Sequence, residues 1–323
     1  MPWVSMDVDK IIGILSKQFS VRHATYFDVA NGLTEIDDSI VVHACSHQPE
    51  YKIFAEDVLL YLQAQGNRLV PSIHIARSLE NKGYQELYKR LRGIKSLTAL
   101  YIAKPSELDA KSLTYPVVFK STTGFGSSGV QLVQTPEGLR HATRAESYFT
   151  LSQVPKIIRS KIGYFVRKYL LGRKNLRPYG DYYSPMKRFV LQQFIPNLSF
   201  DYKVLVYQER AFVLKRSVAD DDFRASGSEK FAFEDPPDGL LDYARSLLRQ
   251  FDEPYLSLDI CFDGSKFYLI ECQGVHFGPY TLLNAPKHYV WNGAEWGVEY
   301  GCADLEEVTA ESLVLYIAQS NAH

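Results

Sequence analysis

Short apolar runs alternate with amphipathic segments over the N-terminal third of the chain. Residues 38–44 (DSIVVHA) are rich in β-branched side chains and predict a buried strand, and residues 68–71 (RLVP) predict a second one. Between them, residues 53–63 (IFAEDVLLYLQ) place apolar side chains at helical spacing, and Gly66 is suited to end that helix. Residues 78–91 predict another helix. This strand–helix–strand order predicts a small α/β unit of the doubly wound type.

The pattern changes near residue 115, where strand-like runs become frequent. The strand PVVFK is followed by the connector STTGFGSSG and by the strand VQLVQ, which predicts a hairpin with a flexible loop. Further strands are predicted in FVLQQFI, in YKVLVYQERAFVLKRSVA and in YLSLDICFDGSKFYLIECQG. The last of these turns at Asp263-Gly264, a strong hairpin signal. We therefore expect the second part of the chain to be α+β and mostly antiparallel.

Composition changes this picture little. The chain has 323 residues, which suggests about two domains, and its 46% hydrophobic and 23% charged residues are ordinary for a soluble globular protein. A formal net charge of -1 demands no polyanionic partner. The N-terminus does not read as a secretory signal, no apolar run approaches the length of a membrane span, and the four cysteines show no C-x-x-C spacing. We expect a cytoplasmic protein with reduced thiols.

The connector between the first two hairpin strands is rich in small residues, among them Gly124, Gly126, Ser127, Ser128 and Gly129. Backbone N–H groups that are free of bulky side chains can converge on phosphate oxygens, and Lys120 just before the loop could neutralise one phosphate. The segment is neither a Walker loop, since no Gly-Lys-Ser/Thr follows, nor a Rossmann turn, since a strand comes next. A plain flexible hairpin is an equal alternative for this segment taken alone.

The strand pair at residues 255–273 carries hard oxygen donors. Strand alternation places Asp259 on one strand, with Glu271 and Gln273 on the same face of its partner. Two carboxylates and an amide oxygen suit Mg²⁺ that bridges phosphates. The alternative is a hairpin with polar residues facing water. The apolar neighbours of these residues indicate a buried pair instead, and buried carboxylates need a partner.

These residues occur in a particular order along the chain. It runs through Lys82, Lys120 with the Gly-rich loop, QQFI at residues 192–195, Asp201, Arg216, DFRAS with Arg224, Asp259 and Glu271-x-Gln273. In this order and spacing the chain resembles the ATP-grasp superfamily. Within it, the closest likeness is to the peptide-ligase branch that includes the ribosomal-protein glutamate ligase and glutathione synthetase. The resemblance extends from about residue 50 to about residue 280, most of the chain.

The resemblance implies a fold that is α/β plus α+β. It predicts an N-terminal doubly wound α/β pre-grasp domain over residues 1–80 and an ATP-grasp domain over residues 81–323. Within the latter, a small lid subdomain (about 110–195) and a large catalytic subdomain (about 196–323) would each contain an antiparallel sheet. ATP would be held between these two subdomains.

The resemblance also implies roles for single residues. The ATP phosphates would be held by Lys82, Lys120 and the loop residues Gly124, Gly126, Ser127, Ser128 and Gly129. Further contacts to the nucleotide would come from Gln192, Gln193, Phe194, Ile195, Asp201 and Lys203. Charge on the transferred phosphoryl group would be stabilised by Arg216 and Arg224. Mg²⁺, with Mn²⁺ as the alternative ion, would be held by Asp259, Glu271 and Gln273.

The activity that the resemblance implies is ATP-dependent ligation of a carboxylate to an amine. The carboxylate attacks the γ-phosphate, and an amine then displaces phosphate from the acyl phosphate to form an amide. Phosphoryl transfer mainly requires positioning and charge stabilisation, which suits Lys, Arg and Mg²⁺. Two alternatives stay open: a small-molecule kinase of the same fold that phosphorylates a hydroxyl, and a non-catalytic ATP-binding regulatory protein.

Three positions depart from the family pattern. Gln273 stands where Asn is usual, Lys203 where Arg is common and Gln193 where Glu is common. Gln273 must reach from a chain one methylene longer, and lysine lacks the bidentate fork of arginine. No carboxylate ligand is lost, so we expect activity with one metal ion bound less tightly.

A basic insertion lies between the Gly-rich loop and QQFI. Residues 151–190 contain ten Lys or Arg residues and one acid, Asp181. A predicted helix in this segment has an apolar stripe made of Val154, Ile158, Ile162, Phe165 and Tyr169. Such a helix favours contact with the inner face of an anionic membrane or with an acidic polymer, and packing of the stripe on the fold is an equal alternative.

The insertion is also the main clue to the substrate. It suggests an acceptor that is an anionic or lipid-linked glycan, or a peptide-like molecule, and nucleic acid is disfavoured because no RNA-binding signature accompanies the charge. His276 follows the metal strand, where a hydrogen-bonded loop histidine is favoured over one that faces substrate. The sequence leaves open the acid, the amine, the oligomeric state and the role of residues 290–301.

Overall fold

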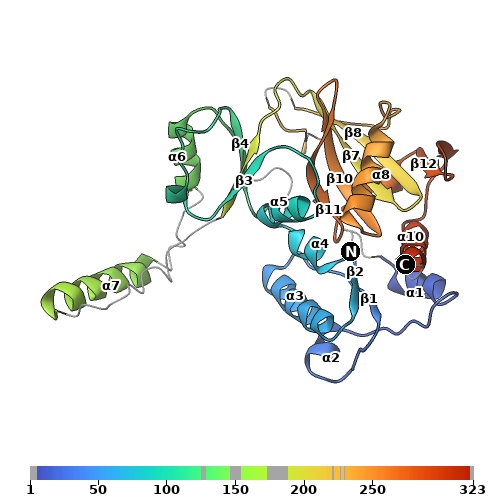
Figure 1. The fold of residues 1–323 in the computed structure, drawn as a ribbon, viewed down its shortest axis with the longest axis horizontal. Coiled ribbons are helices and arrows are strands. Elements are labelled where there is room, and N and C mark those ends of the chain that lie inside the picture. The colour runs from blue at the N-terminus through green and yellow to red at the C-terminus, as the bar shows by residue number, and fades with distance from the viewer. Residues whose placement is uncertain are drawn as a thin grey trace. The chain divides into compact units, whose positions relative to one another are not determined.

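The computed structural model describes residues 6–124, 129–145, 154–172, 188–219, 222–225, 227–228 and 230–320 (Figure 1). The chain forms two compact units. The larger unit comprises Met1–Thr98, Thr123–Ser128 and Ile195–His323, and the smaller unit comprises Ala99–Thr122 and Gly129–Phe194. Each unit has its own sheet and its own core, so the two are described one at a time.

The N-terminal part of the larger unit is the predicted α/β segment. Its elements are α1 (Val8–Leu15), α2 (Tyr26–Ala30), β1 (Ile40–Val42), α3 (Pro49–Ala64), β2 (Arg68–Val70), α4 (Ile73–Ser78) and α5 (Lys82–Leu91). β1 pairs in parallel with β2, and α3 makes the crossover between them, as the apolar pattern predicts. The two short strands therefore confirm the α/β assignment.

The helix predicted over residues 78–91 is present as α5, which begins four residues later and follows a separate helix, α4. α4 ends at Ser78, Glu80 has a positive φ of 47°, and α5 begins after Asn81, whose side chain accepts a hydrogen bond from the Tyr84 backbone N–H. A left-handed residue interrupts the helical hydrogen bonds, and an Asn N-cap restarts them. Lys82 consequently lies in the first turn of α5 instead of in the middle of a helix.

An antiparallel sheet dominates the larger unit. Its strand order is β11-β10-β7-β8-β12-β13, and β9 also pairs with β8. The strands are β7 (Phe200–Tyr207), β8 (Arg210–Ser217), β9 (Phe231–Ala232), β10 (Tyr255–Phe262), β11 (Phe267–Gln273), β12 (Lys287–Trp291) and β13 (Trp296–Tyr300). The predicted hairpin at Asp263-Gly264 joins β10 to β11, and the segment that the sequence left open forms the β12–β13 hairpin.

The two faces of this sheet pack against different helices. One face buries Tyr202, Val204, Val206 and Val213 in a core to which α8 (Leu240–Phe251) contributes its apolar side. The other face buries Leu205, Tyr207 and Phe212 against α9 (Tyr280–Asn284) and α10 (Leu305–Ser320). Side chains alternate between faces along a strand, so Asp201 and Lys203 share the second face with Leu205. This face is thus apolar at one end and charged at the other.

The smaller unit has a four-stranded antiparallel sheet with the order β3-β6-β4-β5. The strands are β3 (Ala99–Ile102), β4 (Val117–Ser121), β5 (Val130–Val133) and β6 (Phe189–Gln193). One face packs against α6 (Pro136–Ala145) through a core that includes Phe119, Phe189 and Leu139. The predicted hairpin of PVVFK and VQLVQ is confirmed as β4 and β5.

The smaller unit also contains the basic segment. The 3₁₀ turn η1 (Pro105–Glu107) follows β3, and α7 (Val154–Phe165) continues into the π-helical turn η2 (Val166–Leu170). The predicted basic helix is therefore present. Among the residues that the structure describes, no helix is long and apolar enough to cross a membrane.

Candidate functional site

Four charged side chains meet on β7, β8 and β10 of the larger unit. Arg216 donates from Nε to Asp201 Oδ1 at 2.7 Å and from Nη2 to Asp201 Oδ2 at 2.8 Å, a bidentate pair. The same Nη2 lies 3.0 Å from Asp259 Oδ2, and Lys203 Nζ donates to Asp259 Oδ1 at 3.3 Å. Strand register explains the cluster, because Asp201 pairs with Arg216 and Lys203 pairs with Asp259. Side chains opposite each other in an antiparallel sheet share one face.

Burial makes this cluster electrostatically strong. Burial alone would raise the pKa of Asp259, but the charges of Arg216 and Lys203 outweigh it and hold that pKa at about 2. Burial opposes the charge on Arg216, yet the two carboxylates raise its pKa above the ordinary value. Burial, with the neighbouring Asp259, raises the pKa of Asp201 against the pull of Arg216. Arg216 is therefore a permanently charged guanidinium that two carboxylates hold in place.

Glu271 and Gln273 lie beside this cluster on β11. Glu271 is directly opposite Asp259 in the strand register, and Gln273 is opposite Ser257. Both residues thus share a face with Asp259, as the sequence predicts, although a bulge between Asp259 and Ile260 shifts the register beyond them. The Glu271 carboxylate forms no hydrogen bond or ion pair with any residue that the structure describes. It is partly exposed and free to accept a further cation.

The donor chemistry of these residues fits a hard divalent cation in part. Glu271 and Gln273 offer a carboxylate and an amide oxygen, which suit Mg²⁺. Asp259 is already engaged by Arg216 and Lys203, so a metal ion would compete with two cations for its oxygens. Within the described part of the chain, no three His, Cys, Asp or Glu side chains come together as a metal-holding group. Glu271 is thus the best-placed protein ligand.

Lys82 and the Gly-rich connector meet within the larger unit. Lys82 is buried at the start of α5, and its Nζ donates to the Gly124 carbonyl at 2.8 Å. Gly124 has a φ of 112°, a conformation that other residues rarely adopt. Gly126, Ser127 and Ser128 lie outside the described residues. Lys82 therefore contacts the start of the predicted phosphate loop, and its role toward ATP stays a prediction.

Lys120 and Gln192 share one face of the small sheet. Lys120 pairs with Val190 across β4 and β6, and Val118 pairs with Gln192, so all four side chains lie opposite the face that packs on α6. Lys120 and Gln192 are both buried, and the Gln192 Nε2 lacks a hydrogen-bond partner among the described residues. A buried amide without a partner is costly, and a polar ligand would relieve that cost.

The other predicted residues lie nearby in the chain but in different settings. Gln193 is exposed at the end of β6, and Phe194 and Ile195, which follow it, are half-buried. Gly129 accepts a hydrogen bond from the Ser121 backbone N–H at 2.8 Å and so closes the β4–β5 hairpin. Arg224 lies in the loop after β8 and pairs with Asp222, its Nη2 lying 2.7 Å from Asp222 Oδ2. The carboxylate that holds Arg224 thus differs from the two that hold Arg216.

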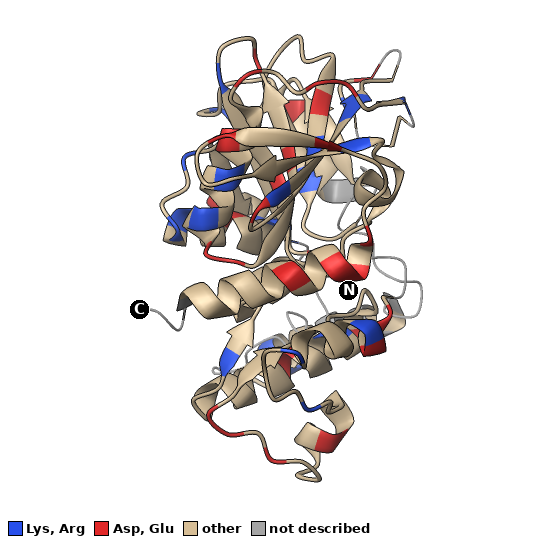
Figure 2. Cartoon of the chain, turned by 90° about the vertical axis from the view of Figure 1, so that its right-hand side faces the viewer, with Lys and Arg blue, Asp and Glu red and all other residues tan. Residues whose placement is uncertain are grey.

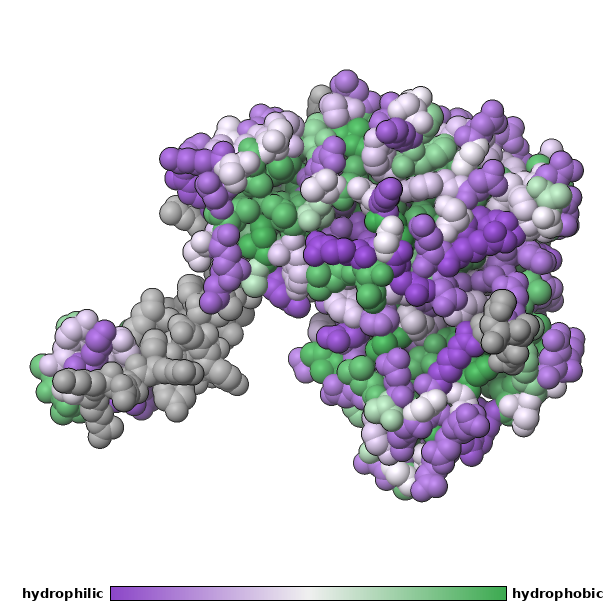
Figure 3. Space-filling model, in the orientation of Figure 1, coloured by the Kyte–Doolittle hydropathy of each residue, from purple (hydrophilic) through white to green (hydrophobic). Residues whose placement is uncertain are grey.

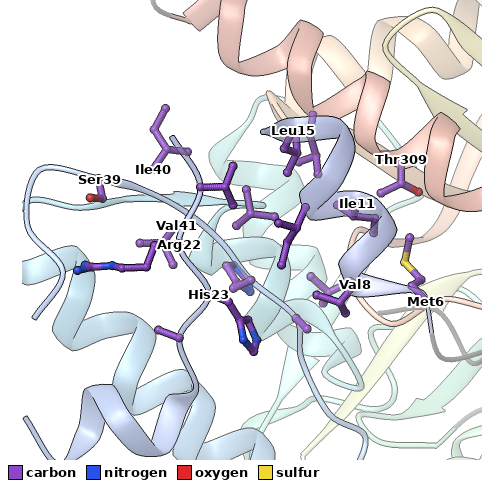
Figure 4. Close-up of a pocket in the computed structure, with 18 of the residues that line it drawn as sticks. Met6, Val8, Ile11, Leu15, Arg22, His23, Ser39, Ile40, Val41 and Thr309 are labelled. Atoms are coloured by element: carbon purple, nitrogen blue, oxygen red, sulfur yellow. The ribbon is translucent and has the colours of Figure 1, made fainter. Parts of the chain in front are cut away.

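The larger unit contains a pocket of about 850 Å³ that sequence reasoning missed. Figure 4 shows Val8, Ile11 and Leu15 of α1 on one side of it, with Ile40 and Val41 of β1 on another. Its lining is mostly apolar, and His23, Arg22 and Thr309 add polar groups. A pocket of this size and composition is typical of small-molecule sites. Its walls come from parts of the chain that are far apart in the sequence, so the sequence contains only a weak signal for this pocket.

A pair of histidines joins this pocket to the end of β11. His276, three residues beyond Gln273, lines the pocket and has a positive φ of 53°. Its ring meets the His47 ring edge-on at a centroid distance of 3.7 Å, and His47 Nδ1 lies 3.1 Å from Glu80 Oε1. Burial, followed by the nearby His47, lowers the pKa of His276 to about 4. His276 is therefore neutral near pH 7.

Charge elsewhere on the larger unit follows no single pattern. Figure 2 shows segments of both signs interspersed over its strands and helices, in keeping with a formal net charge of -1.

One carboxylate of the larger unit, that of Glu253, is fully buried. It accepts hydrogen bonds from the Ser72 backbone N–H at 2.9 Å and from the Tyr88 hydroxyl at 2.9 Å, and burial raises its pKa to about 7. These bonds attach the N-terminal α/β part to the short connection between α8 and β10.

Comparison with known proteins identifies the fold. No family model and no curated protein matches the chain. Among solved structures, the chain is similar to D-alanine–D-alanine ligase from Bacillus anthracis, at 12% identity, with 100% of this chain and 96% of that chain covered and a TM-score of 0.50. It is also similar to D-cycloserine synthetase DcsG, at 12% identity, with coverages of 96% and 94% and a TM-score of 0.53. The chain has the ATP-grasp fold.

Proposed function

We propose that this protein binds Mg·ATP and uses it to join a carboxylate to an amine. The observation that carries the proposal is the Asp201–Arg216–Asp259 cluster beside the Glu271 carboxylate, which forms no ion pair with any described residue. A fixed guanidinium next to a free carboxylate is suited to phosphoryl groups and their counter-ions. The fold supports the same reading, because the solved structures similar to it include a D-alanine–D-alanine ligase and a D-cycloserine synthetase.

Different residues of this chain would have different roles in the reaction. Lys82, Lys120 and the backbone near Gly124 would neutralise and cradle phosphate oxygens, and the buried Gln192 amide would meet a polar edge of the nucleotide. Arg216 would stabilise charge that develops on the transferred phosphoryl group. Its position is set by two carboxylates, so little reorganisation would be needed during the reaction. Arg224 would be a second cation if it leaves Asp222.

A divalent ion would be held chiefly by Glu271 and Gln273, with Asp259 as the third ligand. When bound, it would neutralise phosphate charge and so favour attack by an anionic carboxylate. The balanced reaction has two steps. A carboxylate oxygen bonds to the γ-phosphorus as ADP leaves, and the amine nitrogen then bonds to the acyl carbon as inorganic phosphate leaves and the amine loses a proton.

The pocket beside His276 favours a substrate that carries an apolar group. Its lining of aliphatic and aromatic side chains suits the apolar part of a lipid-linked or otherwise hydrophobic molecule better than a bare sugar. The polar groups His23, Arg22 and Thr309 would fix its orientation. We therefore propose that one of the two substrates places an apolar group in this pocket, and that its reactive end lies toward β11.

Isotope transfer tests this function directly. An acid labelled with ¹⁸O in its carboxylate is incubated with ATP, Mg²⁺ and an amine, and the released phosphate is analysed by mass spectrometry. Ligation through an acyl phosphate moves one labelled oxygen from the acid to phosphate. ADP formation with a hydroxyl acceptor and no free phosphate would instead identify a kinase. Nucleotide binding without ADP formation across a panel of acids and amines would support the regulatory alternative.

A further inference from the structure

The basic helix presents its apolar stripe to solvent. Ile158, Ile162, Phe165 and Tyr169, four of the five stripe residues, each have more than half of their surface exposed. Leu170 and Leu171 at the end of the helix are 73% and 62% exposed. The Phe165 and Tyr169 rings lie 4.8 Å apart, which places them on one side. Among the residues that the structure describes, these four side chains therefore do not pack against the fold, the alternative that the sequence left open.

The same helix is strongly cationic. Residues 154–172 contain five Lys or Arg residues and no acid. Arg159, Arg167 and Lys168 are exposed. Arg167 folds back along the helix, with Nε donating to the Gly163 carbonyl at 3.1 Å, and the Lys168 Nζ lies 5.2 Å from the centre of the Tyr169 ring. These cations therefore border the apolar stripe. In Figure 3 the surface of α7 shows green beside purple.

We propose that α7 and η2 lie in the surface of a bilayer that contains anionic lipid, with the apolar stripe inserted among the acyl chains. An anionic polymer would satisfy the positive charges but would leave Ile162, Phe165 and Leu170 in water. A second copy of the helix would cover the stripe but would bring ten like charges together, counting five on each copy. A bilayer with anionic headgroups satisfies both features at once.

The helix length fits this role. Val154–Leu170 comprises seventeen residues, twelve in α7 and five in η2. It is too short to span a bilayer, which takes about 20 residues, and too apolar on one side for a purely solvated helix. One amphipathic helix binds reversibly, so the protein would exchange between membrane and solution. This proposal does not depend on the ligase reaction.

Vesicle co-sedimentation tests the proposal with a matched pair of variants. The full-length protein is mixed with two kinds of vesicle. One is made of phosphatidylcholine alone, and in the other about one third of the lipid is phosphatidylglycerol. Phe165→Glu is compared with Phe27→Glu, because these two phenylalanines have similar exposures of 59% and 62% and receive the same charge change. We expect binding only to anionic vesicles, weakened about tenfold or more by Phe165→Glu and unchanged by Phe27→Glu.

A second measurement distinguishes insertion from surface attraction. Phe165→Trp and Phe27→Trp each add one tryptophan, and the fluorescence of wild-type protein is subtracted. Anionic vesicles should shift the added emission to the blue in Phe165→Trp alone. The proposal is overturned if both phenylalanine-to-Glu variants bind vesicles as wild type does, if heparin or RNA binds while vesicles do not, or if Phe165→Glu changes only self-association, measured by analytical ultracentrifugation.

Discussion

The chain holds positive charge in two contrasting ways. In the large sheet, Arg216 is buried and donates to two carboxylates, Asp201 and Asp259. On α7 and η2, Arg159 and Arg167 are exposed in a segment without a single acid. A buried charge must be compensated inside the protein because desolvation is expensive, whereas an exposed charge is compensated by water. The first arrangement fixes a cation in space, and the second leaves cations for an external anion.

This difference separates what the fold determines from what a partner determines. The position of Arg216 follows from the register of β7, β8 and β10, so it is set before any ligand binds. The side chains of α7 that the structure describes form no comparable network, so their role depends on the partner that they contact. Substitutions in the buried Asp201–Arg216–Asp259 cluster should therefore affect stability and catalysis together, while substitutions on α7 should affect attachment alone.

The largest expected effect is the loss of the buried cation. Arg216→Ala leaves Asp201 and Asp259 buried without their main partner, so the free energy of unfolding should fall by about 3–5 kcal/mol. Arg159→Ala on α7 should change it by less than about 0.5 kcal/mol, because an exposed side chain is removed. Urea unfolding followed by circular dichroism measures both. Equal losses in the two variants would contradict the contrast between the two regions.

Replacing Glu271 should lower catalysis without lowering stability, although this residue also lies in the large sheet. Glu271→Ala should lower turnover at least about a hundredfold because a metal ligand and a phosphate-side charge are lost. Its melting temperature should stay close to that of wild type, since Glu271 forms no ion pair with any described residue. Glu295→Ala, at an exposed position in the β12–β13 turn, is the control and should retain activity. Wild-type turnover in Glu271→Ala would remove Glu271 from the proposed site.

Low pH should weaken the ion pairs that Asp259 forms with Arg216 and Lys203 in the large sheet. The pKa of Asp259 is about 2 in the folded protein, below its ordinary value of 3.8. Its ionised form therefore stabilises the fold at pH values above 3.8, and this contribution is lost as the pH falls from 3.8 toward 2. The stability difference between wild type and Asp259→Asn should shrink by ~2 kcal/mol between about pH 5 and about pH 2. A difference independent of pH would contradict the assigned ion pairs.

The local elements of this fold were predictable because their signals are short-range. Alternating side chains around Asp263-Gly264 predict the β10–β11 hairpin and the shared face of Asp259, Glu271 and Gln273, and the register confirms that face. The interruption between α4 and α5 was not predicted, because it depends on the left-handed conformation of Glu80. An apolar pattern alone does not report such a backbone conformation.

The long-range parts of the site were beyond sequence reasoning. β10 pairs with β7 across more than forty intervening residues, and that pairing places Asp259 opposite Lys203, while Arg216 joins them through the pairing of β7 with β8. The pocket is assembled from α1, β1 and α10, whose apolar residues look like ordinary core in the sequence. The roles of Arg216, Glu271 and Lys120 in binding remain predictions that rest on the family resemblance and on this geometry.

Replacing Lys120 is expected to have the smallest effect, and it extends the comparison of buried and exposed cations to the smaller unit. It is buried on β4, as Arg216 is buried on β8, although it lies in a different sheet. Lys120→Ala should weaken ATP binding about tenfold, as expected for one charge-assisted hydrogen bond to phosphate. Lys104→Ala, at an exposed position in the same unit, should bind ATP as wild type does. Isothermal titration calorimetry with a non-hydrolysable ATP analogue measures both affinities. An unchanged affinity in Lys120→Ala would show that a buried lysine in this sheet serves the fold and not the nucleotide, and the contrast between buried and exposed cations would then concern structure alone.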